Sequence, residues 1–108
     1  MAEQKTIKDR RFELHEMLKS LIQSSNVYYQ PPESTKMKYP AIRYSRKKID
    51  NNYADNSIYA QHHAYELVVI DADPDSEIVT KVSKLPTCRF DRTYSVDNLN
   101  HTIFTIYY

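Results

Sequence analysis

The sequence predicts an α+β fold in which two helices pack on one face of a mostly antiparallel five-stranded sheet. Apolar residues recur at intervals of three and four near the start of the chain and again after its middle, as in helices with one buried face. Five other segments, rich in β-branched and aromatic residues, are typical of short strands. The expected order is α-β-β-β-α-β-β, and 108 residues are predicted to form a single domain spanning 1–108.

The first helix is predicted to begin after Thr6, whose hydroxyl can accept a hydrogen bond from the backbone N–H of Asp9. The carboxylate of Asp9 also suits the positive end of the helix dipole. Serine and asparagine residues at 24–26 are expected to end the helix. Its apolar stripe, which should face the sheet, consists of Leu14, Met17, Leu18, Leu21 and Ile22.

Three strands should follow this helix. A short strand is predicted over 27–30, before two prolines, and a second over 39–44. Residues 46–56 are polar and are expected to form a long hairpin loop. The third strand, over 64–70, is apolar at most positions and should be buried on much of both faces.

The second helix is predicted to start at Asp73 and Pro74, an acidic N-cap followed by proline at the first helical position. Pro86 should stop it. Two strands are expected over 87–94 and 102–108, joined by a loop over 95–100. The stripe of this helix consists of Ile78, Val79, Val82 and Leu85.

The last strand is apolar on both of its faces, and two helices on one side of the sheet would leave the other side uncovered. A second copy of the chain is the simplest cover for such a face. We therefore expect Phe104, Ile106 and Tyr108 to lie in a self-assembly surface.

The chain contains ten tyrosines and no glycine. Without glycine it cannot form a G-x-G-x-x-G or Walker-type phosphate cradle. Tyrosine is enriched where protein surfaces bury one another. The composition therefore indicates a component of an assembly, and we expect no enzymatic activity.

The charge and hydropathy of the chain limit the classes of partner and the cellular compartment that we expect. The net charge is +1, so no global field attracts the protein to nucleic acid or to an acidic membrane. No apolar stretch approaches the roughly 18 residues that span a bilayer. We expect a protein without membrane contact or direct sequence-specific nucleic-acid recognition, assembled in cytoplasm.

Three groups of residues have the composition of a chemical site. The acidic run 71–77 spaces carboxylates as calcium loops do, but helix capping explains it and the loop lacks glycine. His62 and His63 are adjacent on a strand, so they should point to opposite faces. Cys88 lies in an alternating segment and should be a half-buried thiol. We expect no catalytic, cofactor-binding or metal-binding residues.

The segment after the second strand combines basic and aromatic residues, which single-strand nucleic-acid sites also combine. Asp50 and Asp55 interrupt a continuous phosphate track, and a solvated hairpin is the simplest alternative. We favour a charged loop that docks on a protein partner. The residues expected to face that partner are Arg46, Lys47, Lys48, Tyr53 and Tyr59.

Nearly the whole chain, including the leading helix, resembles the tail terminator (tail completion) proteins of tailed bacteriophages, sometimes described as minor capsid or head-tail connector components. The resemblance lies in the order of the segments and in patterns of strand residues. These patterns are Tyr39-Pro40-x-Ile42-x-Tyr44, Tyr65-x-Leu67-x-Val69-Ile70-Asp71-x-Asp73-Pro74-Asp75-Ser76 and Phe90-x-x-x-Tyr94-x-x-Asp97-x-Leu99-x-His101-x-x-Phe104-x-Ile106-Tyr107-Tyr108.

The resemblance implies a virion protein that forms a ring, usually hexameric, which caps the finished tail tube and ends its polymerisation. The ring would then offer a surface to the head-side connector protein. It implies neither an enzyme nor a cofactor. Two alternatives stay open: another neck protein, such as a head-side stopper or adaptor, and a small nucleic-acid-binding protein.

Overall fold

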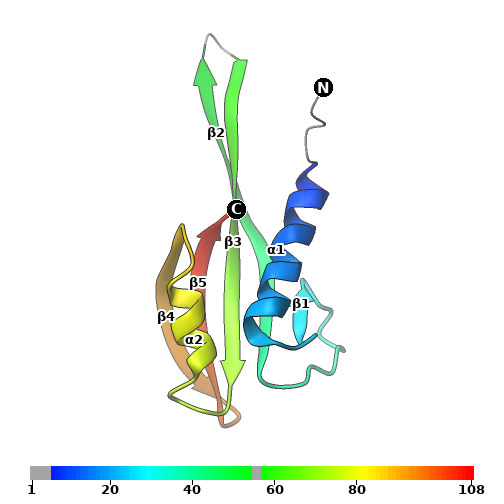
Figure 1. Ribbon diagram of the computed structural model, residues 1–108, viewed down its shortest axis with the longest axis vertical. Helices are drawn as coiled ribbons and strands as arrows, with labels where there is room; N and C mark the ends of the chain where they lie inside the picture. Colours follow the sequence, from blue (N-terminus) through cyan, green and yellow to red (C-terminus); the bar gives the residue numbers. More distant parts are fainter. Residues whose placement is uncertain (1–5, 55–56) are drawn as a thin grey trace.

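A computed structural model describes the backbone of residues 6–54 and 57–108, and the side chains of 6–53 and 61–108. It confirms the predicted α+β fold and element order. Two helices lie side by side on one face of a five-stranded sheet (Figure 1). The elements are α1 (Ile7–Ile22), β1 (Val27–Tyr29), β2 (Ala41–Ala54), β3 (Ser57–Asp71), α2 (Glu77–Ser83), β4 (Cys88–Val96) and β5 (Leu99–Tyr107).

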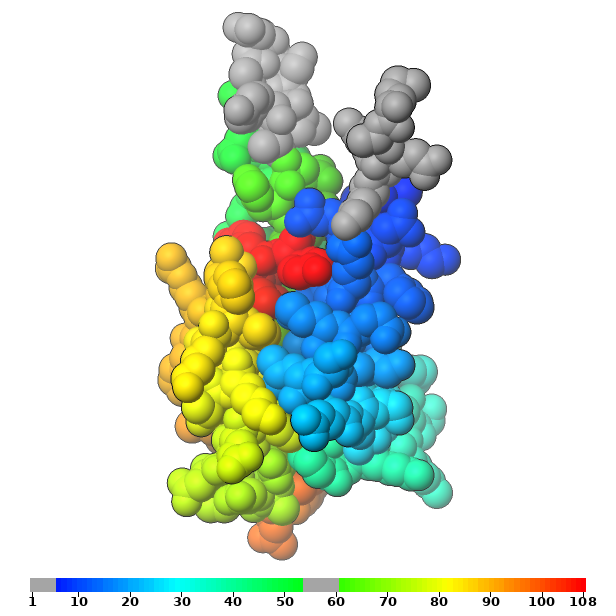
Figure 2. Space-filling view, in the orientation of Figure 1, coloured from blue at the N-terminus to red at the C-terminus, as the bar shows by residue number. Residues whose placement is uncertain are grey.

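The strands are arranged in the order β1-β2-β3-β5-β4. β1 runs parallel to β2, and the other neighbours are antiparallel. The main core lies between the helices and the sheet, which α1 and α2 together cover (Figure 2). Both predicted helix stripes are confirmed, because each residue in them is buried or packs against this core. The buried residues of this core that hold the helices against the sheet are Leu14, Leu18, Ile42, Leu67, Val69, Val82, Phe104 and Ile106.

The start of α1 is confirmed and the predicted start of α2 is wrong. Thr6 accepts a hydrogen bond from the Asp9 backbone at 3.1 Å, and the Asp9 carboxylate accepts one from the Thr6 backbone at 3.2 Å. The N-cap of α2 is Ser76, three residues after the predicted Asp73. Asp73 instead accepts from the backbone of Asp75 at 2.9 Å, which closes a local turn before the helix.

Two segments predicted to be loops are mainly strand. β2 continues to Ala54 and β3 begins at Ser57, so the polar residues at 46–56 belong largely to a paired ribbon. The loop predicted over 95–100 is a two-residue turn, because Val96 already pairs with Leu99. Asp97 and Asn98 have φ values of 53° and 63°, which aspartate and asparagine tolerate better than most residues in a type I′ turn.

The self-assembly surface predicted on β5 is wrong for Phe104 and Ile106. These side chains are 1% and 2% exposed and lie in the core beneath the helices. Tyr108 is partly buried against the same core. On the opposite face, Ile103 is buried in a smaller cluster with Val68 and Ile70, against which Met37 and Leu99 pack. The chain itself therefore buries the apolar side chains on both faces of β5 from Ile103 to Ile106.

Candidate functional site

The hairpin of β2 and β3 is longer than the strands beside it, so its far part has no neighbouring strand in the described sheet. β5 pairs with β3 only from Ala64 to Asp71, whereas β2 stays paired with β3 as far as Ala54 and Ser57. The hairpin therefore projects beyond the sheet as a two-stranded ribbon (Figure 1). An isolated two-stranded ribbon is marginally stable in water. Contact with a partner would stabilise it.

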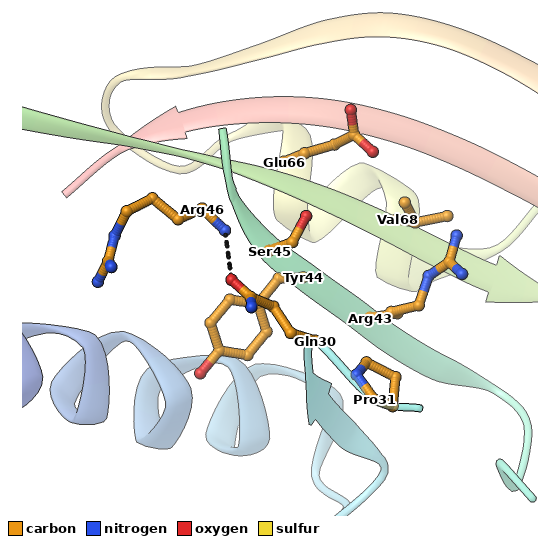
Figure 3. A pocket seen from close by; sticks show the side chains of 8 residues that line it. All are labelled: Gln30, Pro31, Arg43, Tyr44, Ser45, Arg46, Glu66 and Val68. Carbon is orange, nitrogen blue, oxygen red and sulfur yellow. Dashed lines mark hydrogen bonds between the residues drawn. The ribbon is translucent and has the colours of Figure 1, made fainter. Parts of the chain in front are cut away.

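Both outer edges of the sheet are open in the part of the chain that the structure describes. β4 is the last strand on one side, and its residues after Cys88 are all exposed. On the other side β1 pairs with β2 only as far as Tyr44. Beyond it the Gln30 side chain accepts a hydrogen bond from the Arg46 backbone at 3.3 Å, and both residues line a pocket (Figure 3). The remaining edge of β2 is free to pair with another strand.

Exposed apolar side chains concentrate along these two edges. Among the residues with described side chains, eight large apolar ones are exposed, and five of them belong to β2 or β4. Such clustering is typical of a surface that another protein covers. The five are Ile49, Tyr53, Phe90, Tyr94 and Val96.

The structure separates the residues that the sequence grouped as one partner-facing loop. Lys47, Lys48 and Tyr53 are exposed on β2, and the Tyr53 side chain is 67% exposed. Arg46 is only partly exposed, because its guanidinium lies over the ring of Tyr65 and donates a 3.4 Å hydrogen bond to that hydroxyl. The side chain of Tyr59 lies outside the described residues.

Sequence reasoning missed a cluster of aromatic and basic residues between α1 and the sheet. The rings of Tyr29 and Tyr44 are 4.9 Å apart, and those of Tyr44 and Tyr65 are 6.2 Å apart. The Arg11 guanidinium lies 4.1 Å from the centre of the Tyr29 ring. Tyr44 and Tyr65 are each 1% exposed. Tyr44 and Tyr65 therefore stabilise the fold and are not available to partners.

Two histidines, His15 on α1 and His63 on β3, have pKa values below the ordinary 6.5. Burial, with the charges of Lys19 and Arg11, lowers the pKa of His15. Its Nδ1 is 2.7 Å from the Tyr44 hydroxyl, whose pKa burial raises. A hydrogen bond from the neutral Tyr44 hydroxyl to a neutral His15 imidazole agrees with the raised pKa of the tyrosine and the lowered pKa of the histidine.

Burial also lowers the pKa of His63, and the charges of Arg46 and Arg10 lower it further. His63 is 7% exposed, and its Nε2 is 2.9 Å from the Gln61 side-chain oxygen. Its neighbour His62 is exposed, in agreement with the expectation that the two point to opposite faces of β3.

Stability should fall as the pH drops below the ordinary histidine pKa of 6.5. Because the folded-state pKa values of His15 and His63 are lowered, the unfolded chain binds protons more readily in this range. Each histidine can remove at most about 1.4 kcal/mol of stability per pH unit. Urea unfolding between about pH 7.5 and 5.5 measures the loss. The variant His63→Gln should show a weaker pH dependence, whereas His62→Gln, on the exposed face, should match the wild type. Equal slopes for all three proteins would contradict the role of His63.

Three further observations concern reactivity, metal binding and membranes. Burial raises the pKa of the half-buried Cys88 thiol to about 11, which disfavours a nucleophilic thiolate at neutral pH. Within the described residues, no three His, Cys, Asp or Glu side chains are grouped so that they could hold a metal ion. None of the described helices is long and apolar enough to cross a membrane.

Comparison of the sequence with models of known protein families and with curated proteins finds no match.

Proposed function

We propose that this protein is a structural component of a phage virion that assembles as a ring and caps the tail tube.

 

The ring would end tube polymerisation and present a surface to the head-side connector protein. We assign it no enzymatic activity and no cofactor. The observation that carries this proposal is the projecting hairpin together with the two open sheet edges, and the resemblance to tail terminators agrees with it.

The two open edges support head-to-tail contacts between copies. They lie on opposite sides of the sheet, on β4 and on β2, so the edge of one copy can meet the different edge of the next. Such heterologous contacts close into a ring when the rotation between copies permits it. Burial of the exposed apolar side chains, among them Tyr53 and Phe90, would stabilise this contact. This surface replaces the one predicted on β5.

The ribbon of β2 and β3 supports contact with the tube or with the connector. It extends beyond the end of β5, and it carries exposed Ile49 and Tyr53. Amphipathic tyrosines of this kind are frequent anchors at protein interfaces. We therefore assign the partner contact to the ribbon, with Lys47 and Lys48 exposed at its base.

Light scattering of the purified full chain, alone and with tail-tube protein, tests the proposal. We expect a ring-sized species, hexameric by resemblance, or single chains that assemble stoichiometrically on tube ends. A single chain that ignores tubes would contradict the tail-terminator role. Assembly only in the presence of head-side connector protein would instead favour a stopper or adaptor.

A further inference from the structure

The face of the sheet opposite the helices carries several basic residues, among them Lys47 and Lys48 at the base of the ribbon. Residues paired across neighbouring strands point to the same face. Val68 pairs with Arg43 and with Ile103, and Ile103 pairs with Arg92, so these four share the face opposite the helices, which we call the open face. Met37 and Leu99 pack against its apolar centre. Apart from Tyr94 and Val96, the exposed remainder of the open face is polar and charged.

An irregularity in β2 brings two consecutive lysines to the open face. Arg46 pairs with Tyr65 and Lys48 pairs with Ala64, so Lys47 is an extra residue in the strand. Neighbouring strand residues normally point to opposite faces, but a bulge changes this alternation. Lys47 Nζ donates a 3.1 Å hydrogen bond to the Thr105 hydroxyl, and Lys48 Nζ lies 5.9 Å from the Tyr107 ring centre.

A second irregularity, in β4, has the same effect on two arginines. Arg89 pairs with Thr105 and Arg92 pairs with Ile103, with an extra residue between them. Thr105 and Ile103 are two positions apart on β5 and therefore share a face. In a regular strand, Arg89 and Arg92 would point to opposite faces. Two separate bulges thus bring basic side chains to one surface.

The open face is more basic than the chain as a whole. Its acidic side chains are Asp50, Glu66 and Asp91, fewer than its five basic ones. Asp50 lies 3.4 Å from Lys48 and Asp91 lies 3.7 Å from Arg92, and both pairs are solvent-exposed and therefore weak. The net charge of +1 conceals this local excess. The five basic residues are Arg43, Lys47, Lys48, Arg89 and Arg92.

An aromatic pair lies on the same face. The rings of Tyr94 and His101 are stacked, 4.9 Å apart and inclined by 11°. His101 pairs with Ile70, which belongs to the apolar centre of the open face. The Tyr94 side chain is 40% exposed, so the outer surface of its ring is available for stacking.

We propose that the open face binds single-stranded nucleic acid without sequence preference. The five basic side chains contact phosphates, and an unstacked base lies on the ring of Tyr94. The aromatic pair favours this ligand over an acidic protein surface. An acidic protein would contact only the basic side chains, whereas a nucleic-acid base can also stack on the exposed ring. The inference does not require the proposed ring, although Lys47, Lys48 and Tyr94 belong to both surfaces. It goes beyond the sequence-based expectation, which favoured a protein partner for Lys47 and Lys48.

Fluorescence anisotropy of a labelled single-stranded oligonucleotide of about 20 bases, with the full chain, tests the inference. With three to five phosphate contacts, the affinity should fall about 20- to 100-fold between 50 and 200 mM salt. The double variant Arg89→Glu, Arg92→Glu should bind at least about tenfold more weakly. Lys81→Glu with Lys84→Glu, on and beside α2, makes the same change in net charge and should change the affinity less than about twofold. Circular dichroism and light scattering confirm equal folding and mass.

A third variant separates stacking from charge. Tyr94→Ala should weaken single-strand binding by about fivefold or more and leave binding of a duplex of the same length unchanged. Binding that is independent of salt, or equally impaired by both charge reversals, would overturn the inference. Competition by polyglutamate as strong as that by the oligonucleotide would overturn it in favour of an acidic protein partner. These readouts differ from the tube-dependent mass that tests the ring.

Discussion

Lysine at Phe90 and Val96 should abolish ring formation and leave the chain folded as a monomer. Both side chains are exposed on β4, at 60% and 48%, so the substitutions remove little of the core. Charged side chains on an edge strand oppose pairing with another strand, because pairing would bury the charge. Light scattering should therefore give the mass of a single chain where the wild type gives a ring.

A matched variant tests whether the position of the lysines matters. Ile7 and Phe12 are also exposed apolar residues, but they lie on α1 and not on an edge strand. Ile7→Lys with Phe12→Lys adds the same charge and should still assemble. If both variants lose the ring, added charge alone explains the loss. If neither does, the edge of β4 is not part of the interface.

Tyr44→Ala should lower the free energy of unfolding by about 3–5 kcal/mol, as truncation of a large buried aromatic residue does. Tyr44 lies at the centre of the cluster beneath α1, between the rings of Tyr29 and Tyr65. The substitution also leaves His15 and Arg11 without a hydrogen-bond partner that they have in the wild type. Since a domain has only about 5–15 kcal/mol of stability, the loss is large.

Tyr53→Ala is the matched control, because it makes the same chemical change at a side chain that is 67% exposed. We expect it to change the free energy of unfolding by less than about 0.5 kcal/mol. Urea denaturation followed by circular dichroism measures both variants. Similar losses for the two would show that the cluster around Tyr44 contributes no more than the exposed ribbon does.

The sequence predicted those parts of the fold that depend on neighbouring residues. The apolar stripe around Leu14 and Leu18 has the period of a helix, and its buried face follows from that period. The capping interaction of Thr6 and Asp9 joins residues three apart, so it too is visible in the sequence. These local patterns determine the element types and their order.

The candidate site was predicted only in part. The exposure of Lys47, Lys48 and Tyr53 agrees with their polar surroundings in the sequence. The sequence does not distinguish Tyr53 from Tyr44, although one is exposed and the other is enclosed by α1 and the sheet. The difference arises from contacts between segments far apart in the chain.

The register between strands explains why the sequence could not predict which strand side chains lie in the core and which lie on the surface. The period of a strand says that neighbouring residues point to opposite faces, but not which face a helix covers. That choice placed Phe104 in the core and Tyr94 on the open face. The bulges at Lys47 and Asp91 interrupt the period itself, and they become visible only once each strand is paired with its neighbour. The sequence alone determined the layers, and long-range pairing determined which side chains each surface presents.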